Sequence, residues 1–217
     1  ASDVYKRQIW AGDGVDTLDG GSGNSDELYG EGGDDLILLI GKDDKIADGG
    51  DGKDEILGAG TNPLDDSTIV FSGNATMNGG AGNDTIVGGT GDNAIQGNHG
   101  HDTIDGANGD DIIQGGDGDD VVLNGDGDDD IDGGDGNDLI EGGDGDDTLT
   151  GGQDQDIIDG DSGSDTAVFN GNFADYTFAI HEGILRDEES DGTTDSIYSI
   201  QTLRFNNGDY SVTTDTS

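Results

Sequence analysis

The stretch that decides the fold runs from Gly79 to Val168, and its last four units read GGDGNDLIE (133–141), GGDGDDTLT (142–150), GGQDQDIID (151–159) and GDSGSDTAV (160–168). A nine-residue unit repeats ten times here without an insertion. Its pattern is G-G-x-G-x-D-x-U-x, in which U is aliphatic. Self-similarity at a fixed period indicates a solenoid, in which each unit stacks on its neighbours.

Each unit predicts half of one solenoid turn. One aliphatic residue in nine cannot form the apolar face of a helix, which needs one every three or four residues. Glycine at the first, second and fourth places permits positive φ and close approach of the backbone, so that half predicts a turn. The x-U-x half predicts a short strand with U pointing inward. Two units then close one 18-residue turn, and equivalent residues of successive turns lie about 4.8 Å apart.

The sixth place of the unit predicts a metal site. Residues 18 apart share an edge, so these places form two ladders: Asp84, Asp102, Asp120, Asp138 and Asp156 on one edge, and Asn93, Asp111, Asp129, Asp147 and Asp165 on the other. Stacked carboxylates repel one another unless a positive charge lies between them. The chain has no Lys or Arg between Asp54 and Leu185, so the counter-charge must come from outside. Carboxylate and carbonyl oxygens favour calcium over zinc or copper.

The repeat resembles the calcium-binding nonapeptides of RTX (repeats-in-toxin) proteins, fully over 79–168 and more loosely over 11–57. The resemblance implies an all-β fold, a right-handed parallel β-roll with two nonapeptide units in each turn. It also implies that each sixth-place residue binds calcium between successive turns, together with carbonyl groups of the glycine-rich half. Asn93 and Asp154, which replace the usual Asp and Gly, are expected to weaken the sites around them. Bacterial type I secretion, which needs no cleaved N-terminal signal, is a further implication.

The regions around the regular array divide the rest of the chain. Residues 1–10 fit neither the repeat nor a motif and are expected to form a non-repeat tail. Residues 11–57 hold about five imperfect units, with inward places at Leu18, Leu28, Ile37, Ile46 and Ile56. Their aspartate places, which we predict as further calcium ligands, are Asp16, Asp26, Asp35, Asp44 and Asp54. The lysines of this region, Lys42, Lys45 and Lys53, either replace ions in part or lie solvated at the surface.

Two further regions of the chain, 58–78 and 169–217, do not follow the repeat. Residues 58–78 contain the turn signal Asn62-Pro63 and an apolar strand at 68–71. We expect an irregular coil with a loop there, and the alternative is a partner surface. Residues 169–217 introduce aromatic side chains, and strands are predicted at 176–181, 183–187, 196–205 and 210–212. They are expected to form an antiparallel β cap that covers the apolar edge of the last coil.

The composition restricts the function. The 217 residues include 51 acidic and 7 basic ones, a formal net charge of −44, which excludes binding to nucleic acids and attraction to anionic membranes. The longest apolar run, Leu36 to Ile40, is too short to cross a bilayer, and the absence of Cys excludes disulfides and thiolate metal sites. One buried aliphatic side chain per nine residues is too little to offset the cost of ordering. We therefore predict a chain that is disordered without calcium and folded with it.

Other kinds of site are poorly supported. His99 and His101 could hold a transition metal, but they lack a third ligand and are expected to be exposed. Asp128 to Gly133 matches the opening of an EF-hand loop, yet Leu139 stands where the bidentate Glu belongs. The sequence contains no H-E-x-x-H, G-x-S-x-G or P-loop motif. We therefore expect no catalytic activity and no cofactor except calcium.

These observations predict a calcium-binding module that folds on extracellular calcium and supports the secretion and folding of a larger secreted protein. Stacking geometry gives about four sites on each edge of the regular array. One alternative is an adhesive module with a cell-surface or carbohydrate partner. The other is the non-catalytic tail of a secreted protease, lipase or polysaccharide-modifying enzyme.

Overall fold

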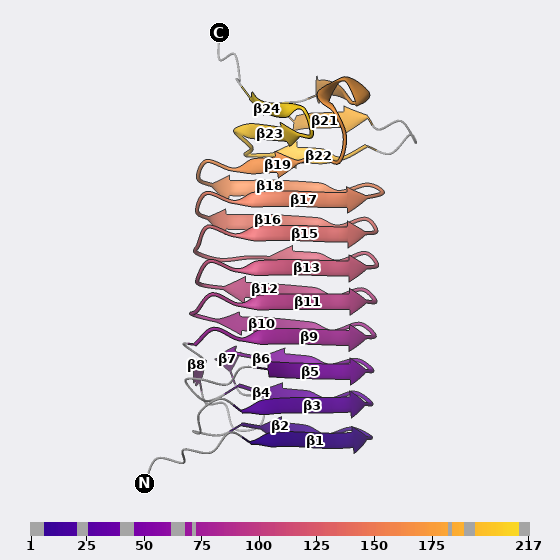
Figure 1. Cartoon of the computed structure of the whole chain (residues 1–217), viewed down its shortest axis with the longest axis vertical. Helices are drawn as coiled ribbons and strands as arrows, with labels where there is room; N and C mark the ends of the chain where they lie inside the picture. Colours follow the sequence, from indigo (N-terminus) through magenta and orange to yellow (C-terminus); the bar gives the residue numbers. More distant parts are fainter. Residues whose placement is uncertain are drawn as a thin grey trace.

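The computed structural model describes residues 7–20, 26–39, 46–61, 68–70, 73–181, 184–188 and 194–212. Two eleven-stranded sheets lie face to face along the molecule, as Figure 1 shows. The chain alternates between them, so each turn contributes one strand to each sheet. Within the roll, neighbouring strands are parallel, and the predicted parallel β-solenoid is confirmed.

The strands of sheet A are, in spatial order, β1 (Gln8–Asp13), β3 (Glu27–Gly32), β5 (Ile46–Asp51), β9 (Thr76–Ala81), β11 (Ala94–His99), β13 (Ile112–Asp117), β15 (Asp130–Asp135), β17 (Thr148–Gln153), β19 (Thr166–Val168), β23 (Thr202–Phe205) and β24 (Gly208–Ser211). The strands of sheet B are β2 (Thr17–Asp19), β4 (Leu36–Leu38), β6 (Glu55–Leu57), β10 (Thr85–Gly89), β12 (Thr103–Ala107), β14 (Val121–Leu123), β16 (Leu139–Asp144), β18 (Ile157–Ser162), β22 (Ser196–Tyr198), β21 (Ile184–Glu188) and β20 (Thr177–His181).

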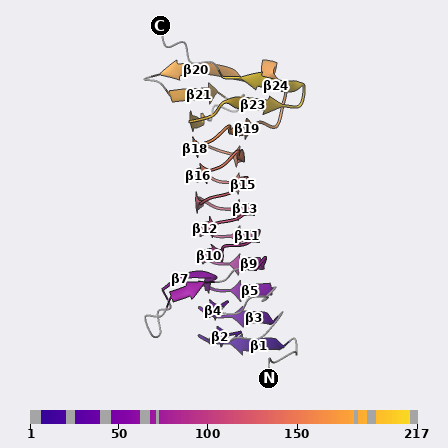
Figure 2. The same cartoon turned by 90° about the vertical axis from the view of Figure 1, so that its left-hand side faces the viewer.

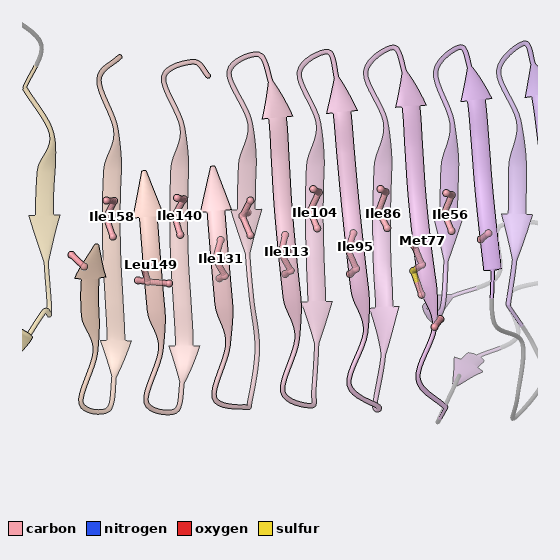
Figure 3. Close-up of a cluster of buried hydrophobic side chains, with 14 of the residues drawn as sticks. Ile56, Met77, Ile86, Ile95, Ile104, Ile113, Ile131, Ile140, Leu149 and Ile158 are labelled. Carbon is pink, nitrogen blue, oxygen red and sulfur yellow. The ribbon is translucent and has the colours of Figure 1, made fainter. Parts of the chain in front are cut away.

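The core is a double column of aliphatic side chains between the sheets (Figure 3). Ile86 lies opposite Ile104, and Ile95 opposite Ile113, which confirms the predicted length of the regular turn. The inward residues of the regular array are all buried: Met77, Ile86, Ile95, Ile104, Ile113, Val122, Ile131, Ile140, Leu149, Ile158 and Ala167. Their flanking residues point outward because side chains alternate along a strand.

The first turns of the roll differ from the prediction in two ways. Leu18 lies opposite Ile37, and Leu28 opposite Ala47, so each of these turns is one residue longer than a regular turn. Ala47, and not Ile46, is the buried residue, because the extra residue enters between Ile37 and Ala47 rather than at Asp48. The roll also begins at residue 8, three residues before the expected boundary, since β1 pairs with β3.

One turn of the roll is much longer than the others. Asp48 lies opposite Asn78, so equivalent positions are 30 apart along the chain here, instead of 18 as in the regular array. The additional chain includes an antiparallel hairpin of β7 (Ala59–Thr61) and β8 (Thr68–Val70), and β7 lies beside sheet B next to β10 (Figure 2). On that side Leu38 and Leu57 are buried in a small second core. The predicted turn at 62–63 lies outside the described residues.

The C-terminal region extends the roll before it caps it. Ile197 lies opposite Ile158, and Leu203 opposite Ala167, so β22 and β23 form one more turn. The prediction of one antiparallel strand over 196–205 is wrong, because a bend with φ 52° at Ser199 separates the two strands.

Antiparallel pairing occurs between β20 and β21, β21 and β22, and β23 and β24. The 3-10 helix η1 (Phe173–Asp175) precedes β20. The rings at this end contact one another, and Phe169 stacks on Phe205 with a centroid distance of 5.1 Å. Within the described residues, no helix has the length and apolar character needed to cross a membrane.

Candidate metal centre

The sixth-place residues stand immediately before the strands, and the parallel register stacks them in two ladders. We call the ladder that precedes the sheet B strands ladder B. Its members are Asp16, Asp35, Asp54, Asp84, Asp102, Asp120, Asp138, Asp156 and Asp195. Ladder A precedes the sheet A strands, and its described members are Asp26, Ala75, Asn93, Asp111, Asp129, Asp147, Asp165 and Gln201. The structure thus places every predicted residue in a ladder except Asp44, which lies outside the described residues.

Most rungs are joined to the next by a hydrogen bond from a main-chain N–H to a carboxylate, and two rungs of ladder A are joined by a bond to an amide oxygen. The main-chain N–H of Asp84 donates to Oδ1 of Asp102 at 2.8 Å, and that of Asp111 donates to Oδ1 of Asp129 at 2.7 Å. On ladder B these bonds are unbroken from Asp16 to Asp195. The bonds hold each side chain against the turn, where the ladder aspartates from Asp35 to Asp165 are at most 3% exposed.

The second oxygen of these carboxylates has no donor. Oδ2 is shielded from solvent and lacks a hydrogen-bond partner in Asp35, Asp54, Asp84, Asp102, Asp111, Asp120, Asp129, Asp138, Asp147, Asp156 and Asp165. A buried charged oxygen without a partner is strongly unfavourable. The ladders therefore need a positive group beside each Oδ2.

The first-place glycines show what else surrounds that oxygen. A Cβ on Gly133 would lie 2.5 Å from Oδ2 of Asp138 and 2.6 Å from the carbonyl oxygen of Gly151, one turn later. The missing side chain thus leaves space into which a carboxylate oxygen and a carbonyl oxygen both project. Such a set of hard oxygen ligands fits calcium, which takes carboxylate and carbonyl groups in flexible geometry. When bound, calcium would supply the positive charge that the buried oxygens lack.

The pKa values of the ladder aspartates also indicate that the ladders need a positive charge. Burial raises the pKa of Asp84, Asp120 and Asp129 to about 7, and that of Asp156 to about 8. The main-chain N–H bond partly offsets this, and the carboxylates of adjacent rungs raise each pKa further. Without a cation, these groups would hold protons near neutral pH.

The oxygen atoms available to a metal ion come partly from aspartate side chains and partly from backbone carbonyl groups. Nowhere in the described part of the chain do three or more His, Cys, Asp or Glu side chains converge on one point. His99 and His101 are exposed, as predicted, and serve different partners: His99 Nδ1 lies 2.9 Å from Asp117, and His101 Nδ1 accepts the N–H of Asp119 at 2.7 Å. The EF-hand alternative is excluded, because residues 130–135 form β15.

The sequence prediction missed two residues of the ladders, Asp195 and Gln201, and one residue that pairs with a ladder aspartate, Arg7. Asp195 stands two residues before the buried Ile197, the spacing of the repeat, and this signal could have identified it. Gln201 occupies the last rung of ladder A, where it accepts the N–H of Asp165 at 2.6 Å. Arg7 forms an ion pair with the buried Asp26 at 2.9 Å. No feature of the repeat pattern pointed to Gln201 or Arg7.

Comparison with known proteins agrees with this geometry. The sequence model of the RTX calcium-binding nonapeptide repeat matches residues 8–26, 71–104, 78–113, 96–131 and 132–167. No curated protein matches the chain. The matched segments cover more than half of the sequence and contain the aspartates of both ladders from Asp84 to Asp165. The chain therefore belongs to the family of RTX calcium-binding nonapeptide repeats, acidic and non-catalytic modules that bind calcium.

Proposed function

We propose that this module folds when it meets extracellular calcium, and that its folding supports the secretion and folding of a larger bacterial protein. RTX repeats are typical of proteins exported by type I systems. The observation that carries the proposal is the set of eleven buried aspartates whose Oδ2 atoms have no donor. A roll with so many unpaired buried oxygens needs cations to be stable.

The calcium gradient across the cell envelope gives this dependence a role. Sites of extracellular modules have dissociation constants of about 10⁻⁴–10⁻³ M, far above the calcium concentration of a cytosol. The chain would therefore stay unfolded where it is made, with its net charge of −44 keeping it extended and soluble. It would fold after export, where calcium fills the ladders.

Circular dichroism through a calcium titration tests the folding step. In excess chelator the spectrum should be that of a disordered chain, and millimolar calcium should produce a β spectrum cooperatively. Magnesium at the same concentration is the control for general screening of charge, because magnesium demands octahedral geometry and keeps its waters. A β spectrum that persists in chelator would refute the proposal.

The secretion step needs a separate experiment. The full-length protein that carries this module would be exported into medium with calcium or with chelator. We expect a protease-resistant product with calcium and a degraded one without it. Equal protease resistance in both media would contradict a role for calcium-driven folding after export.

A further inference from the structure

At some rungs of ladder A, an N–H group of the protein stands where the other rungs have an unpaired Oδ2. Asn93 is the first example. Oδ1 of Asn93 accepts the N–H of Ala75 at 2.9 Å, as an aspartate would. Its Nδ2 donates to the carbonyl oxygen of Gly91, within the same turn, at 2.7 Å. Both polar atoms of Asn93 are thus paired, whereas the Oδ2 of Asp129, farther along the ladder, is not.

The backbone before Asn93 differs from that of the following units. The fourth-place residues of the next two units, Gly100 and Gly109, have φ of 133° and 121°. Gly91 occupies the same place in its unit but is outside the positive-φ region. With this backbone conformation, the carbonyl oxygen of Gly91 lies within hydrogen-bond distance of Asn93 Nδ2. The preceding rung is Ala75, at the end of the long turn, so no carboxylate faces Asn93 from that side.

The same arrangement recurs at the other end of the ladder. Gln201 accepts the N–H of Asp165 with Oε1 at 2.6 Å, and its Nε2 donates to the carbonyl oxygen of Ser199 at 3.0 Å. In both cases an amide replaces the carboxylate, and it donates to the carbonyl group two residues earlier. The four aspartates from Asp111 to Asp165 therefore lie between two amide side chains, those of Asn93 and Gln201.

The first rung of ladder A carries an internal cation instead. Oδ1 of Asp26 accepts the main-chain N–H of Arg7 at 2.9 Å. Oδ2, the atom that is unpaired in the other aspartates, accepts a bond from Arg7 Nη2 at 2.9 Å. Asp26 is fully buried, so the guanidinium supplies positive charge where an ion would otherwise be needed.

We infer that calcium on ladder A is confined to the block Asp111, Asp129, Asp147 and Asp165. Asn93, Gln201 and Arg7 replace ions at the rungs of Asn93, Gln201 and Asp26, and Ala75, the remaining described rung, has no ligand oxygen in its side chain. Ladder B has no such substitution between Asp35 and Asp156, where every Oδ2 is unpaired. The two edges thus bind unequal numbers of ions. Asp26 and Asn93, which the repeat pattern predicts as ligands, are excluded from the metal sites. The inference rests on the proposed calcium binding and specifies where it occurs.

Matched pairs of variants test this inference by counting bound ions. Native mass spectrometry at the calcium concentration that saturates the wild type gives the number directly. Asp26→Asn should bind as many ions as the wild type, whereas Asp35→Asn, at an unpaired rung of ladder B, should bind fewer. Asn93→Ala should likewise keep the full number, and Asp129→Asn should lose at least one. Loss of ions from Asp26→Asn or Asn93→Ala would overturn the inference.

The outcomes separate the two proposals. A wild-type chain that binds no calcium would refute the proposed function itself, whereas ion loss from Asn93→Ala would refute only the division of ladder A. If Asn93→Ala gives no β spectrum in calcium, Gln201→Ala in the last turn is the second variant. Gln201→Ala should also keep the full number of ions, and a reduced number would count against the inference.

Discussion

Two kinds of glycine recur along the regular array, and they are required for different reasons. Gly133, at a first place, has no positive φ but leaves the space that Asp138 Oδ2 and the Gly151 carbonyl group share. Gly136, at a fourth place, has φ of 141°, where a side chain is strained. The first kind of glycine therefore leaves room for the proposed ion, and the second shapes the turn.

Replacing a first-place glycine should damage the metal site. In Gly133→Ala the new Cβ would displace Asp138 Oδ2 or the turn that follows, and we expect a loss of about 1–3 kcal/mol in the free energy of unfolding. The midpoint of a calcium titration should also rise. Gly208→Ala is the control for an added methyl group, because a Cβ there meets no atom within 4 Å, although its φ of 135° adds backbone strain. A variant of Gly133 with an unchanged calcium midpoint would contradict this role.

Asp154 is a natural exception at a fourth place. Its φ of 75° lies in the left-handed region, which costs an L-residue about 1–2 kcal/mol. Asp154→Gly should therefore increase the stability of the calcium-loaded roll by about 1 kcal/mol, measured by urea unfolding in saturating calcium. No gain in stability would show that the carboxylate of Asp154 offsets its strain.

The ladders are the elements on which pH acts. Burial raises the pKa of Asp84 to about 7 and of Asp156 to about 8, so the folded, ion-free roll binds more protons than the unfolded chain does. Its stability must therefore fall as the pH rises from the ordinary aspartate pKa through these raised values. An ion that binds to this ion-free roll would also have to displace those protons.

The predicted starting state of a calcium titration is not this roll but the unfolded chain, whose aspartates have the ordinary pKa of 3.8 and are already ionised. The calcium midpoint in circular dichroism titrations should therefore stay nearly constant between about pH 8 and about pH 6, and it should move to higher concentration as the pH falls to about 4, where protons compete with calcium for the carboxylates. Titration at constant ionic strength controls for screening. A midpoint that already rises between about pH 8 and about pH 6 would show that calcium displaces protons from a roll folded without it, and would contradict calcium-driven folding.

The small second core changes the role of outward-facing residues on sheet B. Leu38 occupies the same outward column as Leu123, yet Leu38 is 1% exposed and Leu123 is 38% exposed. Leu38→Ala should lower the free energy of unfolding by about 2–4 kcal/mol, because it removes buried apolar contacts. Leu123→Ala is the matched control and should change it by less than about 0.5 kcal/mol. Equal effects in urea unfolding would show that the small second core contributes nothing.

The sequence predicts an element correctly where the nine-residue period is unbroken, and it fails where the period is interrupted. Between Gly79 and Val168 a fixed period determines the register, so the ladder positions of Asp102 and Asp120 follow from counting alone. Ile46 was wrongly predicted to point inward, because the unit around it departs from the repeat pattern. The single inserted residue could be assigned to either side of that unit. The last turn was missed because the chain leaves the repeat before it returns to Ile197, so the period cannot be counted across the gap. Arg7 could not be assigned to Asp26, because long-range pairing leaves no trace in a nine-residue period.

At the scale of the whole molecule, the two ends of the roll are closed differently. The C-terminal end is covered by contacts among Phe169, Phe173, Tyr176, Phe178, Phe205 and Tyr210. At the N-terminal end the described ring contact is the stack of Trp10 on Tyr29, with centroids 4.1 Å apart. Solenoids need covered terminal repeats, and the aromatic contacts provide this cover at the C-terminal end.

The aromatic contacts give the roll a mechanical anchor at its C-terminal end. If the roll is pulled along its axis, its regular turns should separate before this end opens, because each of them contributes two aliphatic side chains to the core and no aromatic ring. The protein would then lengthen turn by turn. A module of this kind would extend under tension while its aromatic end stays closed, and it would shorten again as calcium refills the released turns.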